Sequence, residues 1–149
     1  MNELVYRNLS EDEKRQICAW KYGGEYDLYN LPSYEEMQVR QIGFMNPQRE
    51  KNYYGFWDES ILVGFVNILE EKEEVFIGIG VNPDLCNKHY GQRMLLITYE
   101  ISKKLYPNKP LYLEVRTWNI RAVKCYQKAG FRIDGQAYEL TTGIGTGTF

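Results

Sequence analysis

The sequence VFIGIGVNPDLCNKHYGQRMLL, residues 75–96, decides the fold of this chain. Its first seven residues, Val75–Val81, are β-branched, aromatic or small, and Asn82 and Pro83 end this run as they would end a strand. After a short polar loop, apolar residues recur with helical spacing from about Gly91 onward. The stretch therefore predicts a strand, a loop and a helix in that order.

The loop Cys86–Gly91 leads directly into the predicted helix. The N–H groups of the first helical turn and the positive end of the helix dipole converge there, which favours an anion such as phosphate. The stretch lacks the G-x-x-x-x-G-K-[ST] sequence of a Walker loop, and Pro83 stands where a G-x-G-x-x-G loop needs its third glycine. A turn without a ligand is the alternative reading of these residues.

Length and composition indicate one globular domain over residues 1–149, with 44% hydrophobic and 26% charged residues. The formal net charge of −2 argues against a general binder of nucleic acid or membrane surfaces. Three cysteines without CxxC spacing, with His89 as the sole histidine, disfavour a disulfide framework or a structural metal site. We expect a cytoplasmic protein, since no apolar leader or membrane-spanning run is found.

The remaining sequence alternates between helical and strand patterns. Capping boxes at Ser10 and Ser33 predict two helices, the first running to about Lys21 and the second closed by Gly43. The tail from Glu139 is expected to begin a last strand that stays incomplete. Further strands are predicted at residues 4–7, 54–57, 61–69, 111–117 and 131–138, and further helices at 90–105 and 120–129.

Two polar residues of the last predicted helix share one face. Asn119 and Tyr126 are seven residues apart, two helical turns, so a ligand along that face would meet an amide and a phenol. The pattern Asn119-x-x-Ala122-x-x-x-Tyr126-x-x-x-Gly130-Phe131 resembles the second motif of the GNAT superfamily of N-acetyltransferases. The order of the predicted elements is also similar to that family over nearly the whole chain.

The first motif of the same family is matched in part. Val81, Pro83 and Gly91 agree with it, whereas Cys86 stands where the family has glutamine or arginine and His89 where it has its first glycine. A non-glycine residue in the left-handed region costs roughly 1–2 kcal/mol, although histidine tolerates it better than most. Backbone N–H groups supply most of a diphosphate site, so the loop is still expected to bind one.

The resemblance implies an α+β fold with a mixed, mostly antiparallel central sheet, flanked by about four helices. The sheet would be splayed between its fourth and fifth strands, Val75–Val81 and Leu111–Thr117, and acetyl-CoA would be the co-substrate, with its pantetheine arm in the gap. No metal is implied. The expected cofactor-binding residues are Ile79, Gly80, Val81, Asn87, Lys88, His89, Tyr90, Gly91, Gln92, Asn119 and Tyr126.

The resemblance also implies catalytic roles. Tyr126 would be the general acid that protonates the departing thiolate, and a core tyrosine is the alternative reading. Glu114 is the candidate base, because Leu113–Arg116 resembles the corresponding strand of bacterial ribosomal-protein N-terminal acetyltransferases; an exposed strand glutamate is the alternative. His89 as base is a further alternative, which its place at the phosphate end disfavours.

The implied reaction is acetyl transfer to a primary amine by direct attack in a ternary complex, with a small molecule as acceptor. A peptide or protein N-terminus is the alternative acceptor, and a non-catalytic acyl-CoA-binding module is the alternative from another class. A homodimer is possible, and neither nucleic acid nor membrane is an expected partner. An aromatic wall suited to a cationic amine, or ordinary packing, is expected at Trp20, Tyr22, Tyr26, Asp27, Tyr29 and Tyr34.

Overall fold

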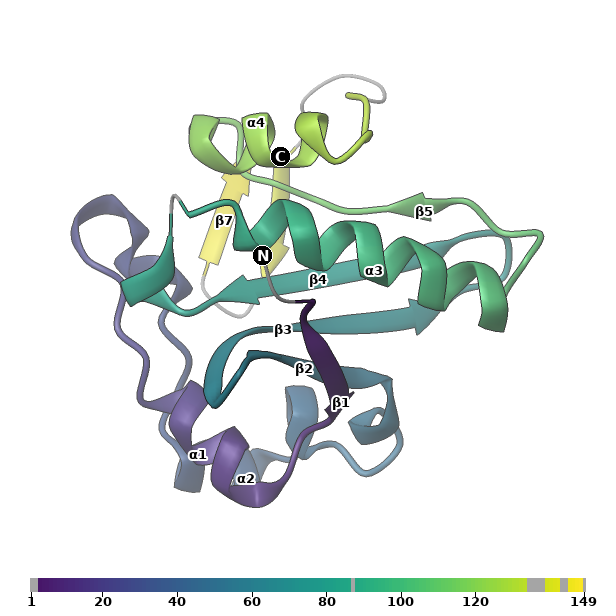
Figure 1. Cartoon of the computed structure of the whole chain (residues 1–149). Coiled ribbons are helices and arrows are strands. Elements are labelled where there is room, and N and C mark those ends of the chain that lie inside the picture. Colours follow the sequence, from purple (N-terminus) through teal and green to yellow (C-terminus); the bar gives the residue numbers. More distant parts are fainter. Residues whose placement is uncertain (1–2, 87, 134–138, 143–144, 149) are drawn as a thin grey trace.

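A five-stranded sheet forms the centre of the computed structural model, which describes residues 3–86, 88–133, 139–142 and 145–148. The strands follow one another in chain order across the sheet (Figure 1). The first four pair antiparallel and the last pair is parallel, which confirms the mixed, mostly antiparallel sheet that the resemblance implies. These strands are β1 (Val5–Asn8), β2 (Tyr53–Asp58), β3 (Ile61–Glu70), β4 (Val75–Val81) and β5 (Leu111–Tyr112).

The strand, loop and helix predicted from residues 75–96 are confirmed. Strand β4 has the predicted bounds, and helix α3 spans Tyr90–Leu105, also as predicted. Met94, Leu95 and Ile101 of α3 pack on the sheet in one hydrophobic cluster, and Figure 1 shows α3 lying along β4. Leu105 is half exposed because it ends the helix.

The N-terminal helices form on their capping serines, but they end differently from the prediction. Helix α1 (Glu11–Cys18) has both hydrogen bonds of the capping box at Ser10, and it stops before Lys21. Helix α2 (Tyr34–Arg40) ends at Gln41 in the left-handed conformation, rather than at Gly43. Short 3₁₀ helices connect these elements to the sheet: η1 (Gly24–Tyr29), η2 (Gly43–Met45), η3 (Glu50–Asn52) and η4 (Pro83–Leu85).

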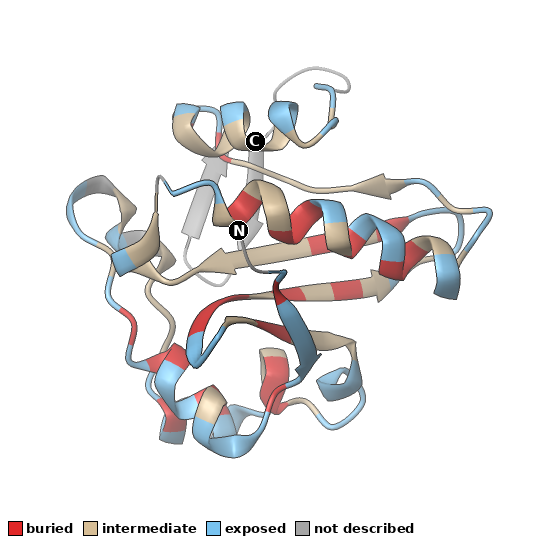
Figure 2. Ribbon diagram, viewed as in Figure 1, coloured by how far each residue is buried: buried red, intermediate tan, exposed pale blue. Residues whose placement is uncertain are grey.

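The sheet buries apolar side chains on both faces, because neighbouring residues of a strand point to opposite sides. Val63 and Val66 pack with α3, whereas Leu62 packs with Ile17 of α1 and Met37 of α2. Figure 2 shows these buried positions along β3 and along the inner sides of the helices. The sheet therefore forms a middle layer between α3 on one face and α1 and α2 on the other. Within it, β4 is paired with β3 along its whole length.

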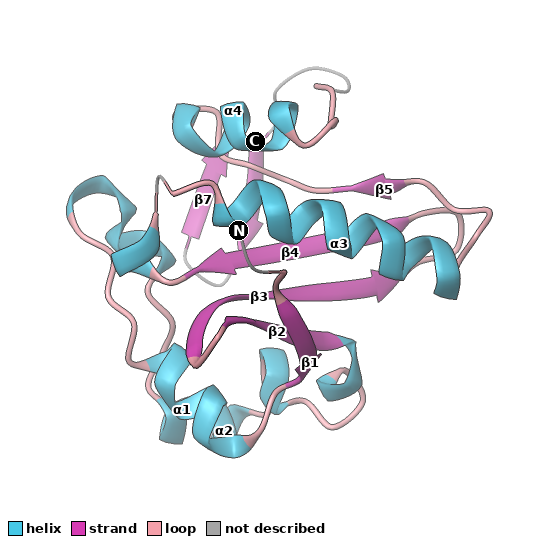
Figure 3. Ribbon diagram, in the orientation of Figure 1, coloured by secondary structure: helices cyan, strands magenta, loops and turns pink. Residues whose placement is uncertain are grey.

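Strand β5 is much shorter than predicted. Its parallel pairing with β4 covers Leu111 and Tyr112, and the chain then runs on without strand pairing to helix α4 (Ile120–Lys128), as Figure 3 shows. The sheet thus splays after two residue pairs, which confirms the splayed α+β fold. Within the part that the structure describes, no helix combines the length and apolar character needed to cross a membrane.

The C-terminal elements also differ from the prediction. Residues 131–133 form no strand, and residues 134–138 of the predicted strand lie outside the described residues. In place of one final strand, β6 (Glu139–Thr142) pairs antiparallel with β7 (Gly145–Thr148) in a separate two-stranded sheet. Which strand pairs with which depends on tertiary structure, and local sequence does not specify it.

Candidate active site

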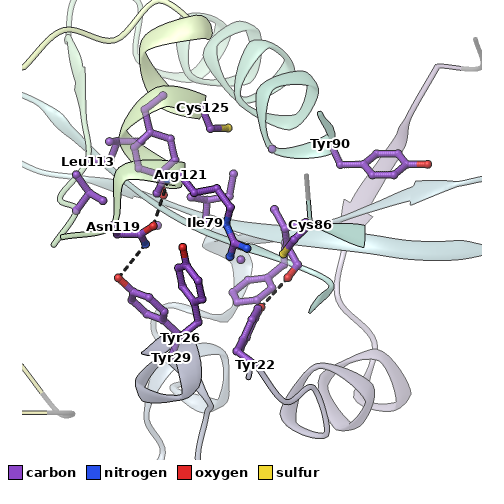
Figure 4. A pocket seen from close by; sticks show the side chains of 18 of the residues that line it. Tyr22, Tyr26, Tyr29, Ile79, Cys86, Tyr90, Leu113, Asn119, Arg121 and Cys125 are labelled. Atoms are coloured by element: carbon purple, nitrogen blue, oxygen red, sulfur yellow. Dashed lines mark hydrogen bonds between the residues drawn. The ribbon is translucent and has the colours of Figure 1, made fainter. Parts of the chain in front are cut away.

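A cavity of about 660 Å³ lies at the splay of the sheet. Its walls are β4, the segment after β5, the N-terminus of α3, helix α4 and the loop around η1, as the close view in Figure 4 shows. A volume of this size is typical of ligand-binding sites, which span about 300–1,000 Å³. Of the residues predicted to form the site, the cavity brings together Ile79, Gly80, Val81, His89, Tyr90, Gly91, Gln92, Glu114, Asn119 and Tyr126.

The edge of β4 presents backbone groups to the cavity at alternate residues. Asn82 N–H donates to the Val63 carbonyl at 2.8 Å, so the hydrogen-bonded pairs with β3 include Gly80 opposite Phe65. The N–H and C=O groups of Ile79 and Val81 therefore point away from β3. Because the ladder with β5 ends at Phe76, these groups face the cavity.

This register corrects one predicted contact. Gly80, an expected cofactor-binding residue, lines the cavity, but its backbone N–H and C=O groups belong to the ladder with β3 and are not available to a ligand. The reason for glycine here is packing, because a Cβ at position 80 would overlap the ring of Phe65. Gly78 lacks such a neighbour, since its Cβ would meet the nearest atoms at 3.6 Å.

The two glycines of β4 give a matched pair of stability predictions. Gly80→Ala is expected to lower the free energy of unfolding by about 1–3 kcal/mol, because the new methyl group must displace the Phe65 ring. Gly78→Ala is expected to change it by less than about 0.5 kcal/mol. Urea unfolding of both variants measures the difference, and equal values would contradict the packing explanation.

His89, the residue directly before α3, has a left-handed backbone conformation. His89 has φ 67° and ψ 11°, the left-handed region that the sequence comparison expected a glycine to occupy. The His89 side chain makes no capping hydrogen bond, so it does not satisfy the first N–H groups of α3. Gly91 is buried, and its Cβ would lie 3.0 Å from the Cys125 Sγ of α4. Helix α4 therefore closes over the N-terminus of α3.

The predicted cofactor-binding set also includes three neighbouring residues, Asn87, Lys88 and Tyr90. The Tyr90 hydroxyl donates to the Asp58 carboxylate at 2.6 Å, and Figure 4 shows this side chain pointing away from the cavity. Tyr90 therefore anchors the loop to the turn between β2 and β3. Lys88 is exposed and does not line the cavity, and Asn87 lies outside the described residues.

Asn119 and Tyr126 lie on the face of α4 that the sequence predicts. The Asn119 Oδ1 caps the helix by accepting from Ala122 N–H at 3.2 Å, while its Nδ2 donates to the Tyr29 hydroxyl at 3.1 Å. Burial raises the pKa of Tyr126, and Cys125 and Tyr29 nearby raise it further. Tyr126 therefore stays protonated, as a proton donor must, and no described residue accepts a hydrogen bond from its hydroxyl group.

The predicted aromatic wall is present in part. Trp20, Tyr22, Tyr26 and Tyr29 line the cavity, whereas Tyr34 packs in the core under α1. Asp27 is exposed and does not line the cavity. The wall thus offers aromatic faces without the expected carboxylate.

The aromatic wall contacts β4 on one side of the cavity and the segment before α4 on the other. The Tyr22 hydroxyl donates to the Val81 carbonyl at 2.6 Å, and burial raises the pKa of Tyr22, so this donor stays protonated. One of the backbone groups at the β4 edge therefore has a partner within the protein. The Trp118 ring, which the sequence analysis missed, packs against Tyr26 and Tyr29 with ring centres 5.6 and 6.1 Å apart.

The cavity lining contains more cationic than anionic side chains. Among the described lining residues Glu114 is the single carboxylate, and it is half-buried. The cationic lining residues are Arg116, Arg121, Lys124 and Lys128. The sequence analysis missed all four, although the spacing of residues 121, 124 and 128 on one helix could have indicated a basic stripe. Such a lining suits an anionic ligand.

No group of three potential metal ligands occurs among the described residues.

A sheet splayed beside a helix N-terminus, with an amide and a phenol on the opposing helix, is the arrangement that the resemblance of the sequence implies. A model of the acetyltransferase (GNAT) family matches residues 7–131, and the chain belongs to this family. No curated protein matches the chain.

Solved structures agree with this fold. An acetyltransferase of the GNAT family from Bacillus anthracis has a TM-score of 0.78 at 17% identity, covering 99% of this chain and 91% of that one. A spermidine N-acetyltransferase SpeG chimera from Vibrio cholerae and hSSAT has a TM-score of 0.76 at 19% identity, with 99% and 92% coverage. The aminoglycoside acetyltransferase AAC(6')-Ib, in complex with ribostamycin and coenzyme A, reaches 0.73 at 16% identity, with 98% and 90% coverage.

Proposed function

We propose that this chain transfers an acetyl group from acetyl-CoA to a primary amine. The main observation behind this proposal is the free edge of β4. Backbone groups of Ile79 and Val81 face a cavity of about 660 Å³ there, and Asn119 and Tyr126 line the same cavity. An extended amide-containing arm can add to such an edge as a missing strand does. Family membership, the fold of CoA-bound neighbours and the helix N-terminus at one end of the cavity support acetyl-CoA as the co-substrate.

The transfer proceeds by direct attack. The amine nitrogen bonds to the thioester carbonyl carbon, a backbone N–H at the β4 edge stabilises the carbonyl oxygen, and the C–S bond breaks. Tyr126 gives its proton to the leaving thiolate, and Glu114, directly or through water, takes a proton from the amine. The cavity lining supports these roles, because it holds both side chains together with the β4 edge.

The acceptor is a small primary amine bound against the aromatic wall Trp20, Tyr22, Tyr26 and Tyr29. Structural neighbours crystallised as spermidine and aminoglycoside acetyltransferases support a small acceptor. A long polyamine is disfavoured, because the described lining holds one carboxylate against four cationic side chains. A peptide N-terminus is the second candidate acceptor. It is favoured because Glu114 lines the cavity and belongs to Leu113–Arg116, which resembles a strand of bacterial ribosomal-protein N-terminal acetyltransferases.

Calorimetry and a thiol-release assay test this function. CoA is expected to bind with a dissociation constant well below millimolar, and free thiol is expected to appear when acetyl-CoA is mixed with a suitable amine. The panel contains spermidine, an aminoglycoside, free amino acids and a peptide with a free N-terminus. No association with CoA at millimolar concentration would contradict the proposal, and binding without release above hydrolysis would indicate an acyl-CoA-binding module instead.

A further inference from the structure

Arg121 is a cavity residue whose charge the proposed reaction does not use. Its side chain leaves the first turn of α4 and reaches the ring of Tyr26, with the guanidinium carbon 4.0 Å from the ring centre. The face of an aromatic ring attracts a cation, so this contact holds the Arg121 guanidinium group in place. In the described part of the chain, no residue forms an ion pair or hydrogen bond with Arg121. Its N–H donors therefore remain available to a ligand.

The position of Arg121 on α4 shows which part of the cavity it serves. Arg121, Cys125 and Lys128 recur at i, i+4 and i+7, so they share one face of the helix. That face meets the N-terminus of α3, because Cys125 Sγ lies 3.0 Å from where a Gly91 Cβ would be. Gln92 Nε2 also donates to the Lys128 carbonyl, at 3.4 Å. Arg121 thus belongs to the anion-binding side of the cavity.

The loop before α3 lies within the field of this guanidinium. Figure 4 shows Arg121 reaching into the cavity toward Cys86. Burial raises the pKa of the Cys86 thiol, and the positive charge of Arg121 opposes that rise. Cys86 itself is neutral when protonated, and Lys88 does not line the cavity. Arg121 is therefore a cationic side chain of α4 whose charge acts on this loop.

We propose that Arg121 is a diphosphate-binding residue, which adds from α4 the charged side chain that the loop before α3 does not direct into the cavity. The proposal rests on the proposed function, because it assigns a contact to the same co-substrate. A planar guanidinium with several donors suits phosphate oxygens better than any other side chain. Tyr26 orients the guanidinium beforehand, which lowers the entropy lost on binding.

Three related ligands separate this role from others. Arg121→Gln is expected to raise the dissociation constants of CoA and dephospho-CoA alike by about 10- to 100-fold, since a charge-assisted contact is lost. Pantetheine, which has no phosphate, is expected to bind both proteins equally. Calorimetry measures the first two ligands and NMR titration the third. Lys104→Gln, at the exposed far end of α3, removes the same charge and is expected to change none of the three.

A rescue experiment controls for misfolding. Cys86→Arg in the Arg121→Gln background places a guanidinium in the loop and is expected to recover most of the lost CoA affinity. Unchanged CoA binding by Arg121→Gln would overturn the proposal, and so would an equal loss with pantetheine. A loss confined to the KM of an acidic acceptor would assign Arg121 to the acceptor instead. If the unmodified protein fails to bind CoA, the proposed function itself fails.

Discussion

Tyr126→Phe is expected to lower kcat by about 10²- to 10⁴-fold, the usual contribution of a general acid, while leaving the dissociation constant of CoA nearly unchanged. A leaving thiolate is a base, and a protonated phenol placed beside its sulfur can donate a proton to it. Burial raises the pKa of Tyr126, and the donor therefore stays protonated beyond the ordinary tyrosine value of about 10. Steady-state kinetics at saturating acetyl-CoA, together with calorimetry, measure both quantities.

Two further tyrosine variants show whether the loss belongs to position 126. Tyr99→Phe removes an exposed hydroxyl group on α3 and is expected to leave kcat unchanged. Tyr29→Phe removes the hydroxyl group that accepts from Asn119, so a moderate loss through misplacement of Asn119 is expected. An unchanged kcat for Tyr126→Phe would exclude Tyr126 as the acid, and a larger loss for Tyr29→Phe would assign the role to Tyr29.

Glu114→Gln is expected to lower kcat/KM by about 10²-fold near neutral pH, where the acceptor amine is mostly protonated. The base must remove that proton before the nitrogen can attack. As the pH rises toward the amine pKa, about 8 for an α-amine or about 10 for a lysine-like amine, the fraction of neutral amine grows. The variant should therefore approach the activity of the unmodified enzyme at high pH. The pH profile of kcat/KM measures this convergence.

Glu73→Gln gives the matched control for this prediction. Glu73 lies on the exposed turn before β4 and does not line the cavity, so its removal is expected to leave the profile unchanged. A deficit for Glu114→Gln that stays constant with pH would indicate that Glu114 positions the acceptor rather than accepting its proton. No deficit at any pH would exclude Glu114 from catalysis.

Local sequence determined the elements that depend on neighbouring residues. The capping box at Ser10 and the Asn119 cap are short-range hydrogen bonds; both form, the first as predicted. The bounds of β4 and α3 follow from one run of strand-forming residues, a proline and a helical apolar pattern. Asn119 and Tyr126 share a face because helical periodicity alone places them there.

Tertiary structure decided the features that depend on a partner. Residues 111–117 alternate like a strand, yet pairing ends at Tyr112 because the chain there diverges from β4. The assignment of Gly80 to the β3 ladder follows from register, which the sequence of β4 cannot encode by itself. The end of β5 was therefore predicted poorly, whereas the bounds of β2, β3 and β4 were predicted to within one residue.

The same division holds within the site. The order of motifs along the chain was enough to indicate a CoA-dependent acetyltransferase, because each motif is built from residues close together in sequence. The contacts that shape the acceptor wall join Tyr22 to Val81, 59 residues away, and Tyr29 to Asn119, 90 residues away. The placement of Arg121 over Tyr26 is of the same kind. Such pairs arise where η1 and the segment before it meet β4 and α4 around the cavity, which no local pattern specifies.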